Sequence, residues 1–245
     1  MVYLKANDIG LEYRMPRRLT LARGLRRAKG AGGRIRGAGR SNVVVALDGV
    51  NFELSAGDRL GLVGHNGSGK TTLLKVLFGI FEPSRGNLQM CGKVDALFNI
   101  NLGFRLGASG RRNIELRGLI NGWSKREIDR RMAEIIEFSE LGEFIDLPMK
   151  TYSQGMATRL AFSVATTLEP EILLMDEWIG AGDPEFQEKA RARMDTIASK
   201  AGIIVLATHN HELMHRTCNK VLALEKGVVA YFGSMDEWAA MQESA

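Results

Sequence analysis

Gly64-His65-Asn66-Gly67-Ser68-Gly69-Lys70-Thr71 is the stretch that decides the fold, because it has the glycine, lysine and threonine spacing of a phosphate-binding loop. The apolar run 60–63 before it predicts a buried strand, and the run 72–77 after it predicts a helix. Glycines let successive backbone N–H groups turn toward an anion, and the N-terminus of the helix adds partial positive charge. The stretch therefore predicts a binding site for a phosphorylated ligand between a strand and a helix.

The residue types in this loop favour a nucleoside triphosphate as the ligand. Lys70 can reach the β- and γ-phosphates, and the hydroxyl of Thr71 can ligate Mg²⁺. The other residues expected to contact the nucleotide are Gly64, His65, Asn66, Gly67, Ser68, Gly69 and Thr72. The alternative is a glycine-rich turn that matches by chance, and the strand and helix on either side argue against it.

Length and composition set broad limits. The chain has 245 residues and is 45% hydrophobic, which is ordinary for a soluble globular protein. We find no apolar run long enough to cross a membrane and no signal-peptide core at the N-terminus. The two cysteines, Cys91 and Cys218, lie far apart and lack metal-type spacing, which favours a reducing cytosolic compartment.

The net charge of +5 comes from one segment of the chain. Residues 14–40 hold ten Lys or Arg and no Asp or Glu, and the remainder has 23 basic against 28 acidic residues. Residues 17–29 fit a basic amphipathic helix imperfectly, and the glycine-rich run 30–40 is typical of a linker. Three explanations stay open: binding to an anionic membrane surface, binding to nucleic-acid phosphates, or a solvated loop.

The pattern along the rest of the chain predicts alternating strands and helices. Residues 43–47 and 51–54 are expected to form two strands near the N-terminus. The continuous apolar runs 172–175 and 203–207 are typical of buried parallel strands. Between the N-terminal strands and these two runs, residues 105–165 have helical periodicity and are expected to form a helical subdomain inserted in the nucleotide-binding core.

Local signals add detail to this helical block and to the end of the chain. Ser124 and Glu127 have the spacing of a capping box, so a helix is expected to begin there. A further helix is expected at about 184–200, in the part of the chain where strands and helices alternate again. The runs 221–224 and 228–232 predict a closing hairpin.

Polar side chains follow the predicted parallel strands, at the edge where open α/β sheets bind their ligands. Asp176 can hold Mg²⁺, and Glu177 can orient and deprotonate an attacking water. His209 can contact the γ-phosphate. Each signal is weak alone, but together with Lys70 they indicate a catalytic site for phosphoryl transfer. Tyr13, upstream of the loop, could stack on an adenine, and a half-buried strand tyrosine is the equal alternative.

The order of these motifs resembles the nucleotide-binding domain of an ABC transporter. The phosphate loop is followed by Tyr152-Ser153-Gln154-Gly155-Met156, by 172–177, by Gly180-Ala181-Gly182-Asp183 and by His209. The resemblance implies an α/β fold, with a P-loop NTPase core of mixed β-sheet and flanking helices, the inserted helical subdomain and an N-terminal antiparallel β region. It makes residues 1–245 a single ATP-binding domain that binds ATP and Mg²⁺ and hydrolyses ATP.

Family members pair head to tail, and the resemblance extends to residues that would act across such a homodimer. Ser153 and Gly155 would contact the γ-phosphate held by the partner, and Asp183 resembles the residue that communicates across the dimer. Gln154 and Met156 depart from the usual signature. Asn99 is the best positional match to the family's loop glutamine, and the resemblance therefore makes it an expected Mg²⁺ ligand.

A finer resemblance is to ATPases that export lipid-linked polysaccharides such as O-antigen, capsule or teichoic acid. It rests on 150–156, on the run 159–163, on Trp178 after Glu177, and on the basic insertion at about 16–40. It implies a peripheral subunit on the cytoplasmic face of the inner membrane, with a polytopic permease, a lipid-linked glycan substrate and no nucleic-acid partner. The alternatives are a soluble ABC ATPase acting on nucleic acid or ribosomes, and the ATPase of another transporter type.

Overall fold

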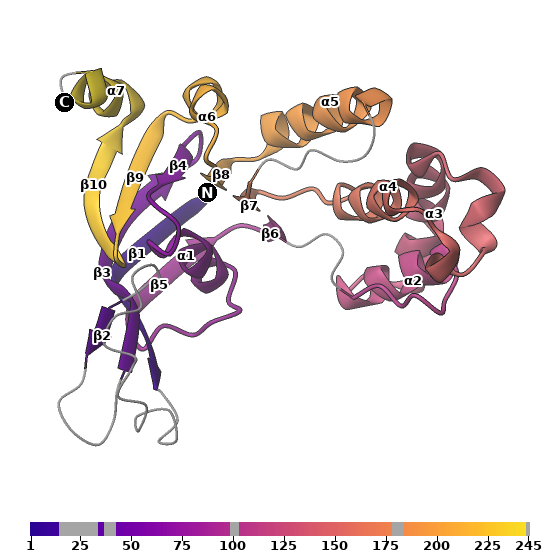
Figure 1. Cartoon of the computed structure of the whole chain (residues 1–245), viewed down its shortest axis with the longest axis horizontal. Coiled ribbons are helices and arrows are strands. Elements are labelled where there is room, and N and C mark those ends of the chain that lie inside the picture. The colour runs from indigo at the N-terminus through magenta and orange to yellow at the C-terminus, as the bar shows by residue number, and fades with distance from the viewer. Residues whose placement is uncertain (15–33, 37–42, 99–102, 178–183, 244–245) are drawn as a thin grey trace. The chain divides into compact units, whose positions relative to one another are not determined.

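The strand, loop and helix predicted from the phosphate-loop motif are all present. In the computed structural model, β4 (Arg59–Val63) precedes the loop and α1 (Lys70–Leu77) follows it (Figure 1). Residues 1–14, 34–36, 43–98, 103–177 and 184–243 are described. Of the basic segment predicted at about 16–40, only residues 34–36 are among them, so the prediction of a basic helix lies outside the described residues.

The chain divides into two compact units. Unit 1 consists of Met1–Ala96, Pro170–Trp178 and Ala201–Ala245, and unit 2 of Leu97–Glu169 and Ile179–Lys200. Unit 1 contains the phosphate loop and every strand that leads to it. Unit 2 is helical and contains the predicted signature residues.

An antiparallel sheet forms the N-terminal part of unit 1. Its four strands lie in the order β2 (Arg34–Arg36), β3 (Val43–Ser55), β1 (Tyr3–Arg14) and β5 (Arg85–Cys91). The two strands predicted at 43–47 and 51–54 are one strand, β3. Pairing with β1 continues across residues 48–50 through register shifts around Ile9, so a local irregularity takes the place of a break between two strands.

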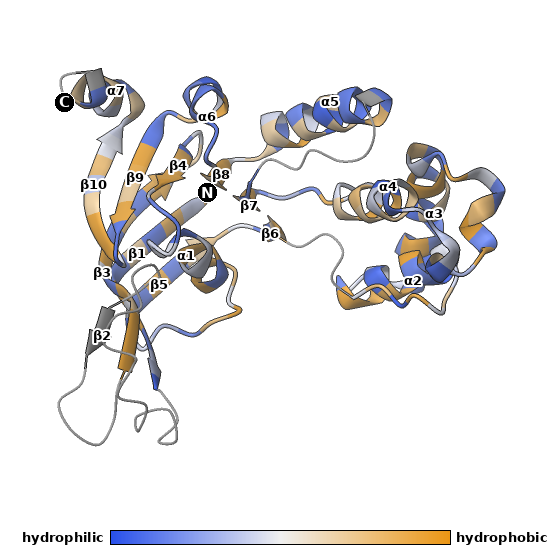
Figure 2. Ribbon diagram, viewed as in Figure 1, coloured by the Kyte–Doolittle hydropathy of each residue, from blue (hydrophilic) through white to orange (hydrophobic). Residues whose placement is uncertain are grey.

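A mixed six-stranded sheet forms the core of unit 1. Its order is β10 (Val228–Ser234), β9 (Lys220–Glu225), β4, β8 (Ile203–Ala207), β7 (Ile172–Asp176) and β6 (Val94–Leu97). The pairs from β9 through β4 and β8 to β7 are parallel, and β10 is antiparallel to β9. Continuous apolar sequence makes β8 buried along its whole length, and β4 and β9 are largely apolar (Figure 2). The carboxyl ends of β4, β7 and β8 therefore lie at one edge.

Two short helices complete the described part of unit 1, α6 (His211–Thr217) and α7 (Met235–Glu243). Asn210 caps α6 by accepting a hydrogen bond from the backbone N–H of Leu213 at 3.0 Å. Met214 of α6 packs so closely on β4 that a Cβ at Gly61 would lie 2.9 Å from its side chain. The glycine thus lets the helix approach the sheet.

Cys218, at the end of α6, is expected to resist thiol reagents. Burial raises the pKa of its thiol to about 12, so at pH 8 only about one part in 10⁴ is thiolate. Cys91 is exposed. Labelling of the native protein should therefore modify one cysteine and labelling after denaturation two, counted by mass spectrometry. A Cys91→Ser variant should stay unlabelled while folded, and rapid native labelling of that variant would contradict the burial of Cys218.

The described residues of unit 2 form four helices and two short 3₁₀ helices, which pack together through their apolar faces. The elements are α2 (Gly110–Ile120), α3 (Lys125–Ser139), η3 (Gly142–Asp146), η4 (Met149–Thr151), α4 (Gln154–Ala165) and α5 (Pro184–Lys200). The capping box predicted at Ser124 is present, with both reciprocal hydrogen bonds to Glu127. In the described part of the chain, no helix is both long and apolar enough to span a bilayer.

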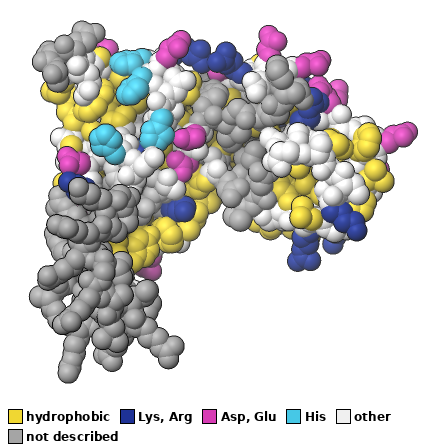
Figure 3. Space-filling model, in the orientation of Figure 1, with side chains coloured by type: hydrophobic (Ala, Val, Ile, Leu, Met, Phe, Trp, Pro, Cys, Tyr) yellow, Lys and Arg dark blue, Asp and Glu magenta, His cyan; other side chains and the backbone are white. Residues whose placement is uncertain are grey.

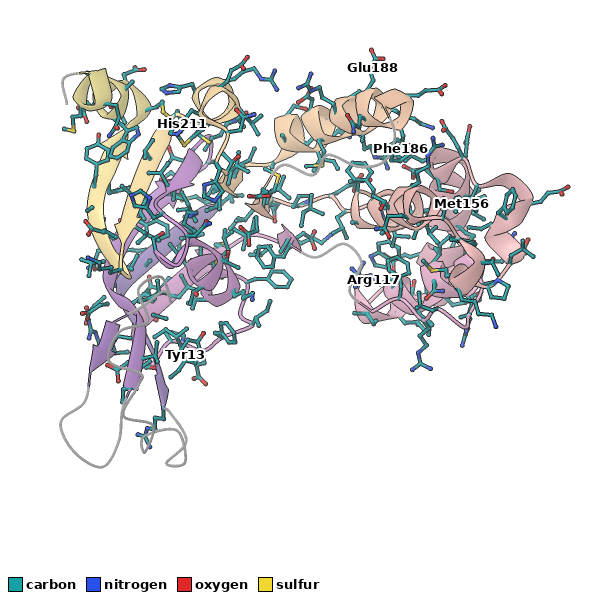
Figure 4. The ribbon with its side chains drawn as sticks, in the orientation of Figure 1. Tyr13, Arg117, Met156, Phe186, Glu188 and His211 are labelled. Carbon is teal, nitrogen blue, oxygen red and sulfur yellow. The ribbon has the colours of Figure 1, made fainter. Side chains whose placement is uncertain are left out.

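Helix α5 belongs to unit 2 and not to the strand-bearing unit, although its sequence lies between two strands of unit 1. Phe186 of α5 packs edge-to-face on Phe138 of α3 and Phe162 of α4, with ring centroids 5.7 and 5.9 Å apart. Lys189 pairs with Glu140 at 2.7 Å. These contacts bind α5 to the same helical unit as α4 (Phe186 and Met156 are labelled in Figure 4).

Candidate nucleotide-binding site

The phosphate loop is shaped by close main-chain packing. Gly64 has a φ of 144°, and a Cβ there would lie 2.3 Å from the carbonyl oxygen of Leu224 and 2.5 Å from Oγ of Ser68. Only glycine fits, so the loop turns directly off the end of β4. The side chain of Ser68 is buried beneath the loop, and that of His65 is exposed.

Lys70 is held inside the loop. Its Nζ donates to the carbonyl oxygens of Gly64 at 2.6 Å and His65 at 3.3 Å, and the residue is only 8% exposed. Burial lowers the pKa of the ammonium, while the nearby carboxylates of Asp176 and Glu177 act in the opposite direction. A desolvated cation beside the loop N–H groups is suited to a polyphosphate.

The acidic residues are placed by the parallel register of the sheet. Asp176 ends β7 and lies opposite Ala207 of β8. The backbone N–H of Glu177 donates to the carbonyl of Ala207 at 2.7 Å. Glu177 has a φ of 71°, which is uncommon outside glycine and is the kind of strained backbone that gathers at functional sites. His209 is exposed two residues after β8.

These groups line one cavity of about 460 Å³ in unit 1, within the usual size for a ligand site. The predicted residues that line it are Tyr13, Asn66, Gly67, Gly69, Lys70, Thr71, Thr72, Asp176, Glu177 and His209. Gly64, His65 and Ser68 belong to the loop but do not line the cavity, because Gly64 and Ser68 pack inward and His65 points to solvent. Histidine and acidic side chains gather on one face of unit 1 (Figure 3).

Four lining residues were missed by the sequence analysis: Val44, Ala46, Ala207 and Thr208. Val44 lies directly opposite Tyr13 in the pairing of β1 with β3, so an apolar strand and an aromatic ring form one side of the cavity. Thr208 follows β8 immediately, and a polar residue at a strand end is a signal that could have found it. Val44 and Ala46 carry no such signal, because only the strand register brings them to the cavity.

The predicted signature residues lie in unit 2 and are not among the residues that line this cavity. Ser153 caps α4 by accepting from the backbone N–H of Met156 at 3.2 Å, and Gly155 follows in the first turn. Both line a separate hollow of about 260 Å³ with Glu140, Leu141, Phe144, Met156 and Arg159. A helix N-terminus with a serine cap favours an anionic ligand. Asn99 and Asp183 lie outside the described residues.

A family model described as ABC transporter matches residues 47–180, more than half of the chain. The match begins in β3 and runs through the phosphate loop and the predicted signature helix to the residues after Glu177.

The chain belongs to the ABC transporter family.

The resemblance stated from the sequence and the predicted fold class are thereby confirmed, and the chain is an ABC ATPase that binds ATP.

Several curated relatives are similar over most of this chain. O-antigen export system ATP-binding protein RfbE of Yersinia enterocolitica is 45% identical over 206 residues, covering 84% of this chain and 86% of that protein. RfbB of Myxococcus xanthus is 42% identical over 205 residues but is matched over only 47% of its length. Teichoic acids export ATP-binding protein TagH of Shouchella clausii is 36% identical over 78% of this chain and 53% of that protein. The chain thus spans about half the length of two of these three relatives.

Solved structures of the family share the fold. An ATP-binding subunit of an ABC transporter superposes with a TM-score of 0.71 over 98% of this chain and 93% of that one, at 22% identity. An ATP-binding cassette described as a dimer in a post-hydrolysis state, with ADP and phosphate, gives 0.67 over 95% of this chain and 98% of that one, at 20% identity. At these identities the likeness concerns the fold alone.

In this ABC ATPase, removing the ring of Tyr13 is expected to weaken ATP binding modestly. The ring is 39% exposed and held edge-to-face against Phe81, with centroids 5.8 Å apart, so one face can meet a base (Tyr13 is labelled in Figure 4). An aromatic stacking partner contributes about 0.5–1.5 kcal/mol, so Tyr13→Ala should raise the Kd for ATP between about twofold and tenfold. Tyr13→Phe should bind like the wild type in a calorimetric titration. Equal affinity in all three proteins would make Tyr13 a plain strand residue.

Proposed function

We propose that this chain is the ATP-hydrolysing subunit of a transporter that exports a lipid-linked glycan across the cytoplasmic membrane. The observation that carries the ATPase part is the cavity at the strand ends, where Lys70, Asp176, Glu177 and His209 meet. The glycan part is supported by relatives of this chain whose names refer to O-antigen and teichoic acid export. The chain would act on the cytoplasmic face with a separate polytopic permease.

The residues of the cavity fit a nucleoside triphosphate with a divalent cation. The loop N–H groups and Lys70 would bind the phosphates, and the Thr71 hydroxyl and the Asp176 carboxylate would hold the cation. Among the described residues, no group of three or more His, Cys, Asp or Glu could hold a metal ion. This fits Mg²⁺, which is usually bound by few protein groups together with substrate phosphates. The bound cation would neutralise charge that develops on the phosphates.

The remaining groups supply the chemistry of hydrolysis. Glu177, exposed at the cavity wall, would orient the attacking water and accept its proton. His209 would donate a hydrogen bond to the γ-phosphate from the neighbouring strand end. Tyr13, Val44 and Ala46 would receive the base at the opposite side of the cavity.

We further propose that the active form is a homodimer. Ser153 and Gly155 line their own hollow at the N-terminus of α4, and a helix end of this kind can bind the phosphates of ATP held by a second copy. Asp183 and Asn99 stay in the proposal as the residue that communicates across the dimer and as a further Mg²⁺ ligand.

A genetic experiment tests the export role. Deleting the gene should cause lipid-linked glycan to accumulate on the cytoplasmic face of the membrane, and the wild-type chain should restore export. Lys70→Ala should not restore it, whereas Lys125→Ala, a surface lysine 73% exposed, should. The tagged wild-type chain should co-purify with a polytopic permease from solubilised membranes. Normal glycan export in the deletion strain, or co-purification with ribosomes instead, would overturn the proposal.

The basic segment at about 16–40 is proposed to bind the anionic membrane surface. The nine basic residues of 16–40 should attract acidic phospholipids by about 1 kcal/mol each near the surface, and salt should screen this attraction. Deleting 16–40 should therefore reduce co-sedimentation with vesicles of anionic lipid at low salt and leave ATP binding unchanged. Tight, salt-dependent binding to RNA that is lost in the same deletion would favour a nucleic-acid partner instead.

A further inference from the structure

The turn that joins β9 to β10 lies between the phosphate loop and the antiparallel sheet. It has two residues, Lys226 and Gly227, with φ of 50° and 83°, as in a tight hairpin turn with both central residues left-handed. The N–H of Gly227 donates to the carbonyl of Ser68 at 2.8 Å. Its carbonyl accepts from the N–H of Asp48, also at 2.8 Å. One residue thus connects the loop to β3 through main-chain groups.

The two elements joined in this way both line the nucleotide cavity. The loop residues line the phosphate side, and Val44 and Ala46 of β3 line the side next to Tyr13. The strand and loop also meet directly, since a Cβ at Gly69 would lie 3.1 Å from the carbonyl oxygen of Ala46. A ligand that spans both sides therefore depends on how closely β3 approaches the loop.

There is no room for a side chain between Gly227 and β3. A Cβ at this position would lie 2.5 Å from the carbonyl oxygen of Ala46, 2.9 Å from its carbonyl carbon and 3.2 Å from Cα of Leu47. All three are main-chain atoms of β3, so no change of rotamer can relieve the contact. A side chain would push β3 away from the turn. The hydrogen bond from the Gly227 N–H to the carbonyl of Ser68 is made to the loop, so a side chain that contacts β3 should not break it.

We propose that Gly227 is a positioning residue that sets the spacing between the base side and the phosphate side of the cavity, and thereby the affinity for ATP. The inference rests on the proposed binding of ATP at this cavity. It distinguishes two kinds of ligand. ATP contacts both sides and depends on the spacing, whereas inorganic tripolyphosphate contacts only the loop and does not.

The test is a calorimetric titration of four proteins with MgATP and with magnesium tripolyphosphate. Gly227→Ala should bind ATP about tenfold more weakly, and tripolyphosphate within about twofold of the wild type. Gly227→Asn should show the same difference with less backbone strain, because asparagine tolerates positive φ. The matched control is Gly57→Ala, since Gly57 also has a positive φ, 95°, but nothing lies within 4 Å of a Cβ there. That variant should bind both ligands normally.

The outcomes separate this inference from the function on which it rests. Unchanged ATP affinity in the Gly227 variants, or an equal loss for both ligands, would overturn the spacing role while wild-type binding stands. A wild-type protein that binds no ATP would contradict the proposed function itself. Amide hydrogen exchange of the wild type gives a readout that needs no variant to fold. ATP should slow exchange at the Asp48 amide more than tripolyphosphate does, and equal protection would overturn the inference.

Discussion

Replacing Glu177 with glutamine is expected to lower ATP hydrolysis between about 10²-fold and 10⁴-fold, while ATP binding survives. Glutamine has the same shape but cannot accept the proton of the attacking water at neutral pH. The backbone position should be kept, because it depends on the hydrogen bond from the Glu177 N–H to Ala207 and not on the carboxylate. Phosphate release and calorimetric titration with MgATP measure the two effects separately.

The control for this variant is Glu53→Gln, which changes a carboxylate on β3 that pairs with Lys5 at 3.1 Å on the surface. Exposed pairs of this kind contribute little to stability, so turnover and affinity should equal those of the wild type. Unchanged turnover in Glu177→Gln would remove Glu177 from its role as base. Loss of both turnover and ATP binding would show that the carboxylate is needed to form the site and not to activate water.

Replacing Ser153 with alanine is expected to lower hydrolysis between about tenfold and a hundredfold, because the proposed hydrogen bond to a charged phosphate of the partner's ATP would be lost. The same change also removes a helix cap, which costs about 1 kcal/mol of stability by itself. Unit 2 contains another serine cap that can serve as a control for the loss of helix stability. Ser109 caps α2 by accepting from the N–H of Arg112 at 3.2 Å, the same distance as in the cap of α4.

Ser109→Ala should therefore lower the melting temperature about as much as Ser153→Ala and leave hydrolysis unchanged. ATP affinity of the isolated chain should be the same in both variants, because the proposed contact of Ser153 is to nucleotide held by the second copy. If the two variants lost activity in equal measure, the effect of Ser153 would be one of helix stability alone. The assignment of the α4 terminus to the partner's ATP would then be wrong.

The sequence predicted those site residues that are marked by the residues next to them in the chain, and it missed those that strand pairing brings to the site. The phosphate loop, the two acidic residues at the end of β7 and His209 after β8 were found because each follows an apolar run at a fixed short spacing. Tyr13 was left between two explanations, and the structure places it at the cavity. Val44 and Ala46 were not found, because the pairing of β3 with β1 brings them to the cavity. The contacts of Gly227 with β3 and with the phosphate loop were not found either, because they depend on the packing of the β9–β10 turn and local pattern does not encode it.

The same distinction applies to the fold. The capping box at Ser124 and the buried strands β7 and β8 were predicted from neighbouring residues and are present. Residues 43–47 and 51–54 form one strand and not two, because β3 stays paired with β1 on both sides of the register irregularity at Ile9 and Val50. Helix α5 was placed by its order in the chain, and its membership of the helical unit depends on Phe186, whose aromatic partners lie more than twenty residues away.

Native mass spectrometry of the Glu177→Gln variant with MgATP tests most directly whether two copies of this chain bind ATP between them. The predicted result is a complex of two chains with two bound ATP molecules, which separates into single chains when the nucleotide is removed. Adding Ser153→Ala should weaken that complex without removing ATP from the single chain. If single chains bound ATP but never paired, at any nucleotide concentration and with the permease present, the proposal that two copies bind ATP between them would be contradicted.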